Sequence, residues 1–324
     1  MTCISKVLIG AFSVALLALG PQAAKAQNYP DKPVTIIVGF PPGGPNDILG
    51  RLLAKALSER IGQPFEVVNK PGASSNLATE AVVRAAPDGH TLLLIGPANA
   101  INSSLFTNLP FNFKKDIIPI AGITREALVL VVHPSVAANS VAEFVALAKA
   151  QPGKIKMAST GNGSSPHVSG VLFKTMTGLD LPIVHFAGGG PALANLIAGQ
   201  TQMMFEPMSA SIEPVKSGKL RALAVTTATR SSALPDTPTV AETVPGYEAS
   251  AATGIGAPAG TPSAIVERLN REINAALADP KFAAELAKTG GAPLKGSSAE
   301  FAKLIEGEID KWAVVVKAAG VTPN

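Results

Sequence analysis

Residues 40–47, which read Phe-Pro-Pro-Gly-Gly-Pro-Asn-Asp, hold the groups of this chain best suited to bind an anion. They follow an apolar run, Val34 to Val38, typical of a buried strand, and they precede a helical pattern from Ile48 to Ile61. A Gly-Gly turn lets backbone amide N–H groups face one concavity, and Asn46 or Asp47 can cap the helix, whose N-terminus carries partial positive charge. Such a loop binds an anion without lysine or arginine.

Three further segments with glycine follow strand-like runs, at residues 96–99, 160–165 and 187–190. In open α/β sheets, ligands bind beyond the carboxyl ends of the strands, so these loops and residues 42–45 are expected to converge on one site. The candidate ligand-binding residues are Phe40, Pro42, Gly43, Gly44, Asn46, Asp47, Pro97, Ala98, Asn99, Asn102, Thr160, Gly161, Ser164, Ser165, Phe186, Gly188 and Glu206.

Two readings stay open for several polar candidates. Asp47 would repel an anion that it faced, so it either caps the loop or helix or reaches the ligand through a bridging water. Thr160, Ser164 and Ser165 offer hydroxyls just before a helix that is expected to start near His167. They are suited to the other end of a diacid, or to ordinary turn and cap chemistry.

The remaining candidates have similar alternatives. Asn99 and Asn102 could donate amide N–H groups to a ligand, and Phe40 and Phe186 either wall the site or belong to the core. Glu206 either pairs with a ligand ammonium or hydroxyl group or is a solvated or ion-paired carboxylate.

Motifs for catalysis and metal binding are missing from the sequence. His90, His133, His167 and His185 have no metal-ligand spacing, and we expect His167 to be structural. The residues around Ser165 are no nucleophile elbow, and no P-loop ending or G-x-G-x-x-G motif follows the first strand. We therefore expect no metal and no cofactor, and an exported hydrolase or isomerase is only a remote alternative.

These loops require an alternation of strands and helices, which the chain shows almost throughout. The expected strands are 35–40, 65–69, 91–96, 127–133, 155–158, 183–185, 202–205 and 222–226. Capping boxes at Ser140 and Ser297, and Pro262 before a run from Ile265 to Ala278, mark helix starts. The alternation predicts an α/β fold with mainly parallel sheets and helices on both faces. Residues 234–262 lack clear periodicity and are expected to carry the chain between two domains.

The first residues have the form of a secretory signal peptide. Lys6 precedes an apolar run from Val7 to Leu19, and Ala24-Lys25-Ala26 matches an A-x-A cleavage site. Residues 1–26 are therefore expected to be removed on export, together with Cys3, the only cysteine. We expect the mature chain to be soluble, without disulfide or lipid anchor.

The charge of the chain excludes one class of partner. The formal net charge of +4 falls to +2 without Lys6 and Lys25, and aromatic residues make up only 5% of the chain. Nucleic-acid binding needs clustered cations or a stacking surface, and the sequence shows neither.

Several motifs resemble the extracytoplasmic receptors of tripartite tricarboxylate transporters, the Bug family. The similarity begins at Tyr29-Pro30 and the loop at 40–47 and extends over essentially the whole mature chain, in order and spacing. It continues through NKPGA (69–73), RAAPDGHTLL (84–93), ASTGNGSSPH (158–167), GGGPAL (188–193), GKLRALAVT (218–226), LPDTPTVAE (234–242) and APAGTP (257–262).

This resemblance implies a two-lobed, type II-like periplasmic binding protein fold with the ligand in the interdomain cleft. Residues 27–125 and 247–324 would form the first domain, and residues 126–246 the second. It also implies a monomeric periplasmic receptor that holds a small organic carboxylate, partly through water. The receptor would deliver that ligand to TctA- and TctB-like membrane subunits or present it to a sensor protein.

This chain departs from the usual family pattern at four places. Pro45-Asn46-Asp47, Phe186-Ala187-Gly188 and Phe205-Glu206-Pro207 stand where the family commonly has Gly-Thr-Asp, Tyr-Lys-Gly and Phe-Asp-Asn. Residues 251–253 are small where an aromatic is often found. These changes leave the first anion loop mostly intact. They remove polar side chains that would bind a second charged end of the ligand. We therefore expect a mono- or dicarboxylate with a substantial apolar or aromatic body, rather than citrate.

Overall fold

The structure is a computed structural model that describes residues 29–161, 163–186, 188–231, 233–288 and 291–319. The expected signal peptide, 1–26, lies outside these residues. The strands are β1 (Val34–Val38), β2 (Phe65–Asn69), β3 (Thr91–Ile95), β4 (Ile117–Val132), β5 (Met157–Ser159), β6 (Ile183–His185), β7 (Met203–Pro207), β8 (Arg221–Val225), β9 (Ser250–Pro258) and β10 (Gly291–Pro293). The α-helices are α2 (Pro45–Ile61), α3 (Asn76–Val83), α4 (Pro97–Leu105), α5 (Phe113–Asp116), α6 (Val141–Ala150), α7 (Ser165–Thr177), α8 (Gly189–Ile197), α9 (Met208–Lys216), α10 (Ser263–Ala278), α11 (Pro280–Lys288) and α12 (Ser298–Ala319). Two short 3₁₀ helices, η1 (Ala73–Ser75) and η2 (Val240–Glu242), complete the described elements.

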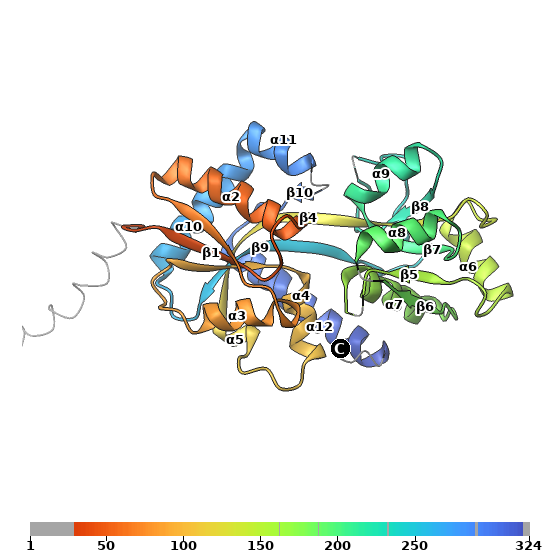
Figure 1. Cartoon of the computed structure of the whole chain (residues 1–324), viewed down its shortest axis with the longest axis horizontal. Coiled ribbons are helices and arrows are strands. Elements are labelled where there is room, and N and C mark those ends of the chain that lie inside the picture. The colour runs from red at the N-terminus through yellow and green to blue at the C-terminus, as the bar shows by residue number, and fades with distance from the viewer. Residues whose placement is uncertain (1–28, 162, 187, 232, 289–290, 320–324) are drawn as a thin grey trace, which may run out of the picture.

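The strands build two lobes that share one long strand, β4 (Figure 1). In the first lobe the strand order is β2-β1-β3-β9-β4, with β10 also paired to β4. In the second lobe the order is β4-β7-β5-β6, with β8 also paired to β4. Figure 1 shows β4 and β9 running between the lobes, so these two strands connect the two halves of the molecule.

The α/β class and the two-lobed fold are confirmed, but the pairing of the strands is mixed rather than mainly parallel. Parallel pairs join β1 to β2 and β3 in the first lobe, and β5 to β6 and β7 in the second. The pairs that involve β4 or β9 are antiparallel. The reason is topological, because β4 leaves the first lobe and β9 returns to it, so the two must run in opposite directions.

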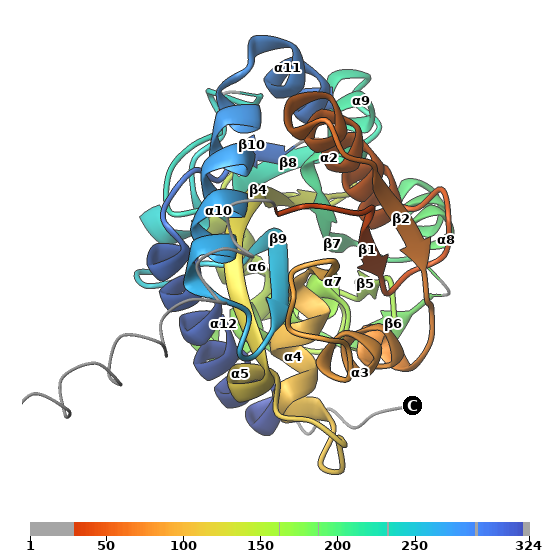
Figure 2. The same ribbon diagram turned by 90° about the vertical axis from the view of Figure 1, so that its left-hand side faces the viewer.

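Helices cover both faces of each sheet. In the first lobe, α2, α10 and α11 bury leucines and isoleucines against one face, and α3, α5 and the first half of α12 pack on the other (Figure 2). In the second lobe, α6 and α7 cover one face, and α8 and α9 cover the other. Burial of these apolar faces is the main stabilising contribution to the fold.

The lobes are also joined by helix packing. Ala100, Ile101 and Leu105 of α4 belong to the same buried cluster as the apolar residues of α6 and α7. Trp312, expected in the core, is 2% exposed in that cluster, and its indole Nε1 donates to Glu308 Oε2 at 2.8 Å. The C-terminal half of α12 therefore packs against the second lobe.

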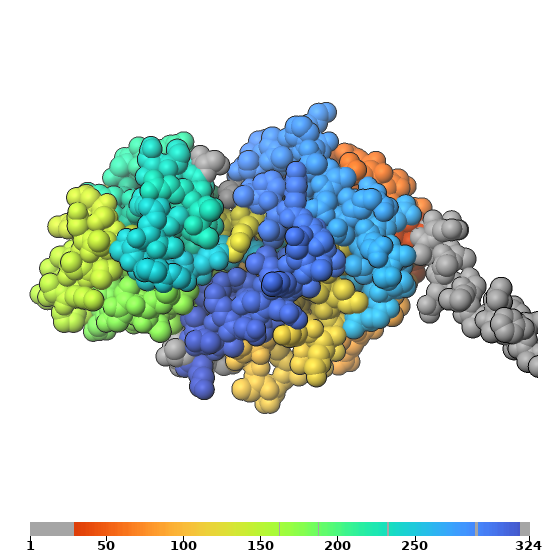
Figure 3. Space-filling view, turned by 180° about the vertical axis from the view of Figure 1, so that it is seen from behind, coloured from red at the N-terminus to blue at the C-terminus, as the bar shows by residue number. Residues whose placement is uncertain are grey.

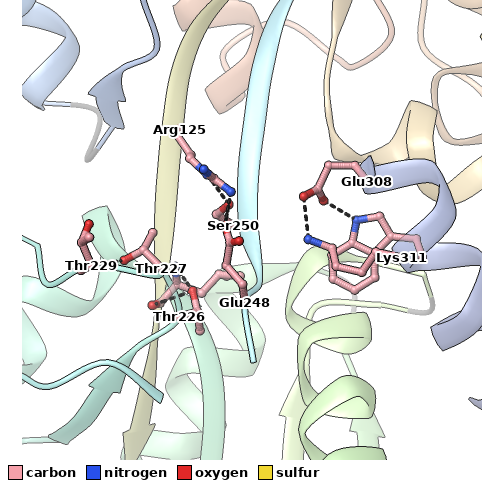
Figure 4. A network of polar contacts seen from close by, with 10 residues as sticks. Arg125, Thr226, Thr227, Thr229, Glu248, Ser250, Glu308 and Lys311 are labelled. Atoms are coloured by element: carbon pink, nitrogen blue, oxygen red, sulfur yellow. Dashed lines mark hydrogen bonds and ion pairs between the residues drawn. The ribbon is translucent and has the colours of Figure 1, made fainter. Parts of the chain in front are cut away.

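Polar contacts tie the connecting strands together. Arg125 of β4 donates to Glu248, and its Nε donates to Ser250 Oγ of β9 at 2.6 Å (Figure 4). Thr226, just after β8, accepts at Oγ1 from the N–H of Leu128 at 2.9 Å. These bonds fix the register of the strands where the chain passes from one lobe to the other.

The expected helix starts are confirmed at two serines. Ser140 Oγ accepts from the N–H of Glu143 at 3.1 Å. Ser297 and Glu300 form a reciprocal capping box, in which Ser297 Oγ accepts at 3.2 Å and Glu300 Oε2 accepts at 2.8 Å. Each bond satisfies an amide that the first turn of the helix would otherwise leave unpaired.

Candidate ligand-binding site

The first anion loop is held by Asp47. One carboxylate oxygen of Asp47, Oδ2, accepts from the N–H of Gly43 at 2.9 Å and from Arg51 Nε at 3.0 Å, and the other accepts from Asn69 Nδ2 at 2.9 Å. The hydrogen bond from Arg51, followed by that from Gly43, lowers the pKa of Asp47 to about 2. Asp47 is thus an ionised, buried clamp on the loop and on the start of α2.

The same clamp leaves other amides of the loop free. No hydrogen bond between described residues uses the N–H of Gly44, Asn46 or Asp47. Gly44 is the N-cap of α2 and makes no side-chain capping bond, and Pro45 has no N–H to offer. Three donors at a positive helix end are therefore available to a carboxylate, while the N–H of Gly43 is already taken.

A second loop, residues 69–76, lies against the first. Asn69 Nδ2 also donates to the carbonyl of Phe40 at 3.0 Å, and a Cβ on Gly39 would overlap the Ser75 hydroxyl. Ala73, Ser74 and Ser75 have φ values of 46°, 51° and 77°, in the left-handed region that L-residues seldom adopt. Close packing on Gly39 accompanies this conformation.

Ser75 and Asn76 are further candidate site residues, which the sequence analysis missed. Both are buried, and no described group bonds to Ser75 Oγ or Asn76 Nδ2. A buried polar atom without a partner is costly, so an arrangement that tolerates two of them is suited to a polar ligand. Both residues lie just after the motif NKPGA (69–73), which is part of the family resemblance. That position was the signal in the sequence that could have identified them.

The start of α4 completes the half-site of the first lobe. The side-chain oxygen of Asn46 lies 3.8 Å from the position that a Cβ on Gly96 would take, so the loops before α2 and α4 meet. Pro97 and Ala98 form the first turn of α4 and are partly exposed. The loops that carry Phe40, Pro42, Gly43, Gly44, Asn46, Asp47, Pro97 and Ala98 are thereby brought together.

The side chains of Asn99 and Asn102 on α4 form hydrogen bonds to other residues of the protein. Asn99 Oδ1 accepts from the N–H of Gly96 at 2.8 Å, and its Nδ2 donates to Thr79 Oγ1 at 2.9 Å. Asn102 Nδ2 donates to the carbonyl of Ser74 at 2.7 Å and to Asn76 Oδ1 at 2.9 Å. In this arrangement both side-chain amides position the loops, and a direct contact with a ligand stays a prediction.

The second lobe offers a matching loop between β5 and α7. Ser164 is the N-cap of α7 and accepts from the N–H of His167 at 3.3 Å, while its hydroxyl donates to the carbonyl of Gly161 at 2.7 Å. His167 Nδ1 accepts from the N–H of Gly163 at 3.0 Å. Burial lowers the pKa of His167 to about 4, so the ring is neutral and structural, as expected. Thr160 and Gly161 are partly exposed on the same loop, and Ser165 is partly exposed at the start of α7.

Glu206 lies where three loop ends of the second lobe meet. It is 2% exposed, and its Oε1 lies 4.0 Å from the position that a Cβ on Gly189 would take, as does the methyl group of Thr160. Its Oε2 has no described hydrogen-bond partner. Burial, and then the charge of Glu126, raise the pKa of Glu206 to about 8. The idea that Glu206 is a solvated carboxylate is therefore wrong for this structure.

Phe186 and Gly188, two further candidates, lie between β6 and α8. Phe186 is partly buried against the cluster that covers α8 and α9, and Gly188 is the N-cap of α8 with φ 107°. Ala187, which stands where the family commonly has a lysine, lies outside the described residues. A Cβ on Gly163 would lie 3.1 Å from Leu105 of α4, so this loop of the second lobe touches the first lobe.

A separate groove lies on the other face of the connecting strands. It has a volume of about 470 Å³, and Figure 3 shows the hollow between the lobes with β4 at its floor. Its lining includes Arg125, Ala127, Ile212, Ala287 and Ala292. We call it the rear groove, because it opens on the side of the molecule seen in Figure 3, opposite to the view of Figure 1.

No three His, Cys, Asp or Glu side chains in the described ranges lie close enough to hold a metal ion. None of the described helices is both long and apolar enough to cross a membrane.

A loop with free amides on the first lobe, and glycine-containing loops around a buried polar group on the second, match what a solute receptor requires. The model of the family described as "Tripartite tricarboxylate transporter family receptor" matches residues 49–321. The chain belongs to this family. Its members are periplasmic solute-binding receptors rather than enzymes, as the sequence resemblance implied.

Individual members of the receptor family support this placement. Protein BugT of Bordetella pertussis is 36% identical over 298 residues, which cover 91% of each chain. The structure of R. palustris Rpa4515 with adipate is 35% identical with a TM-score of 0.78, covering 91% of this chain and all of the other. MatC from Rhodopseudomonas palustris with bound malate is 31% identical with a TM-score of 0.74, covering 89% of this chain and all of the other.

Proposed function

We propose that this receptor binds a small organic carboxylate between its lobes and delivers it to the membrane subunits of a tripartite tricarboxylate-type transporter. The observation that supports this most is the set of free N–H groups on Gly44, Asn46 and Asp47 at the start of α2, fixed by the Asp47 clamp. Hydrogen bonds to a charged group contribute about 1.5–3 kcal/mol each, and micromolar binding corresponds to about −8 kcal/mol. A few such contacts therefore suffice after association costs.

The ligand class is argued from the site and from relatives. The adipate- and malate-bound relatives are receptors of carboxylates. In this chain the second lobe presents Phe186 and Glu206, with no described cation bonded to that glutamate. We therefore propose a carboxylate with an apolar or aromatic body and without a second strongly charged acidic end.

The proposed domains follow the crossing strands. Residues 27–125 with 247–324 would form one domain and residues 126–246 the other, and closure would bring the candidate loops of both onto the ligand. We also propose that residues 1–26 are cleaved on export and that the mature receptor works as a periplasmic monomer.

A thermal-shift screen of the purified mature protein tests the ligand class. We expect aromatic or longer-chain carboxylic acids to raise the melting temperature. A response to citrate or malate, with none to aromatic or longer-chain acids, would refute the proposed ligand body. No response to any carboxylate would refute the function itself.

The delivery step needs a separate experiment, because a receptor that presents its ligand to a sensor has the same fold. Deleting the gene should abolish uptake of the radiolabelled acid found in the screen. Unchanged uptake together with lost transcriptional induction would instead identify a sensor component. Recovery of a chemically altered acid after incubation would indicate an enzyme.

A further inference from the structure

Glu206 is a buried acidic group of the second lobe that the receptor function alone does not explain. Its side chain is enclosed by β4, β7 and the start of α8, yet Oε2 has no described hydrogen-bond donor. A buried acceptor without a donor costs free energy in the ligand-free protein. The cost is recovered only if something that enters the site donates a hydrogen bond to it.

A second glutamate, Glu126, lies close enough to Glu206 to affect its pKa. Glu126 of β4 is the charged group whose field acts on Glu206, and its Oε1 accepts from Ser209 Oγ of α9 at 3.1 Å. Burial also raises the pKa of Glu126. Within the described ranges no lysine, arginine or histidine forms an ion pair with either glutamate. Arg125, which precedes Glu126 in the sequence, is instead bonded to Glu248.

The two ends of the site therefore have opposite character. The first lobe offers N–H donors and a positive helix end, which suit a carboxylate. The second lobe offers two acidic side chains in a desolvated place, where a nearby cation favours their ionised forms and a second carboxylate disfavours them. An ammonium group has three donors and a positive charge, so it supplies what Glu206 Oε2 lacks.

We propose that Glu206, supported by Glu126, is the specificity residue that selects an amino carboxylate, whose carboxylate binds the α2 amides and whose protonated amine binds Glu206. This inference rests on the proposed function and adds the chemistry of the distal end of the ligand. Diacids of equal length are disfavoured, because their second carboxylate meets the acidic pair.

Matched probe series test the assignment by isothermal titration calorimetry at pH 8. For each chain length from three to eight carbons, the ω-amino acid, the α,ω-diacid and the unsubstituted monoacid are titrated into the mature protein. We expect the amino acid of the best length to bind at least about tenfold more tightly than the matched diacid and monoacid. In Glu206→Gln this preference should fall to about threefold or less, with the same stoichiometry.

Two variants control the experiment. Glu213→Gln is the same substitution on an exposed glutamate of α9 and should keep the full preference. Glu126→Gln leaves Glu206 in place and should reduce the preference partly, which keeps the test valid if Glu206→Gln does not fold. A diacid or monoacid that binds as tightly as the amino acid overturns the inference and leaves the proposed function standing. Failure of all three series overturns both.

Discussion

At the residue scale, one carboxylate determines what the anion loop can offer. Because Asp47 takes the N–H of Gly43, the donors left for a ligand are those of Gly44, Asn46 and Asp47 itself. The sequence predicted an anion loop and a capping role for Asp47, which the geometry supports. It could not show that one of the expected donors is occupied, because that depends on side chains from β2 and α2.

Gly43, just before α2, provides a test with a matched control in Gly62, which follows the other end of the same helix. Gly43 and Gly62 have φ values of 81° and 80°, and a Cβ on either would meet nothing within 4 Å. Valine at either position should destabilise the fold by about 1–2 kcal/mol through backbone strain. We expect only Gly43→Val to weaken carboxylate binding, by at least about tenfold, when thermal melts and titrations are compared. Equal affinity of the two variants would remove residues 43–47 from the site.

Glu206 makes the stability of the ligand-free protein depend on pH. Its pKa of about 8 in the folded state, above the model-peptide value of 4.5, means that the folded protein holds a proton that the unfolded chain has lost. Stability should therefore fall as the pH rises through this interval, by at most about 1.4 kcal/mol per pH unit, and the loss should be complete above pH 8.

Urea unfolding between pH 6.5 and 8 measures this effect cleanly. His167, whose pKa is lowered from 6.5 to about 4, gains its stabilising effect as the pH rises and has gained it fully above 6.5. We expect Glu206→Gln to remove most of the slope in this window, and Glu213→Gln to keep it. The same slope in both variants would show that Glu206 is not the titrating group.

At the element scale, the strands with strong apolar runs were predictable and the connecting strands were not. The strands expected at 65–69 and 183–185 are found with those bounds. Most other expected strands differ by one or two residues at their ends, but the strand expected at 127–133 starts ten residues earlier, as β4 (Ile117–Val132). β9 was missed, and it lies in the region expected to join the domains. It reads SAATGIGAP and is buried on both faces, so it shows no alternation.

Crowding explains the small residues of β9. A Cβ on Gly254 would overlap the carbonyl of Ala121 and the ring of Phe301, and one on Gly256 would lie 2.7 Å from Ile95. The sequence shows only a run of small residues, because the neighbours that require them come from β3, β4 and α12. The first half of β4 was missed for a similar reason, since residues 117–126 mix apolar, small and charged side chains.

Two serine N-caps allow the effect of a substitution on stability to be distinguished from its effect on ligand binding. Ser140 caps α6 and Ser164 caps α7, each through a bond to the amide three residues on. Alanine at either position should cost about 1 kcal/mol in the free energy of unfolding. We expect only Ser164→Ala to weaken ligand binding, by several-fold, because its hydroxyl also holds Gly161 in the candidate site. Identical affinities for both variants and wild type would exclude the α7 start from the site.

At the scale of the whole molecule, the connecting strands lie between the candidate site and the rear groove. Arg125 and Ala127 of β4 line the groove, which opens on the side of the molecule opposite to the view of Figure 1. A rotation about these strands that narrows one side must widen the other. The equilibrium between open and closed lobes can therefore be shifted from the rear without touching the ligand.

Filling the rear groove should favour closure around the ligand. Ala287 of α11 lines the groove, whereas Ala284 of the same helix is exposed and does not line it. We expect Ala287→Trp to increase affinity by about three- to tenfold, mostly through slower dissociation, and Ala284→Trp to change neither. Weaker binding in Ala287→Trp, measured by stopped-flow and titration, would contradict a closure that opens the rear.

The most direct test of the account is a crystal structure of the mature protein with the carboxylic acid that gives the largest thermal shift. We expect a carboxylate oxygen within about 3.2 Å of the backbone nitrogen of Gly44, Asn46 or Asp47. A carboxylate bound by a lysine or arginine side chain without those amides, or lodged away from the start of α2, would contradict it.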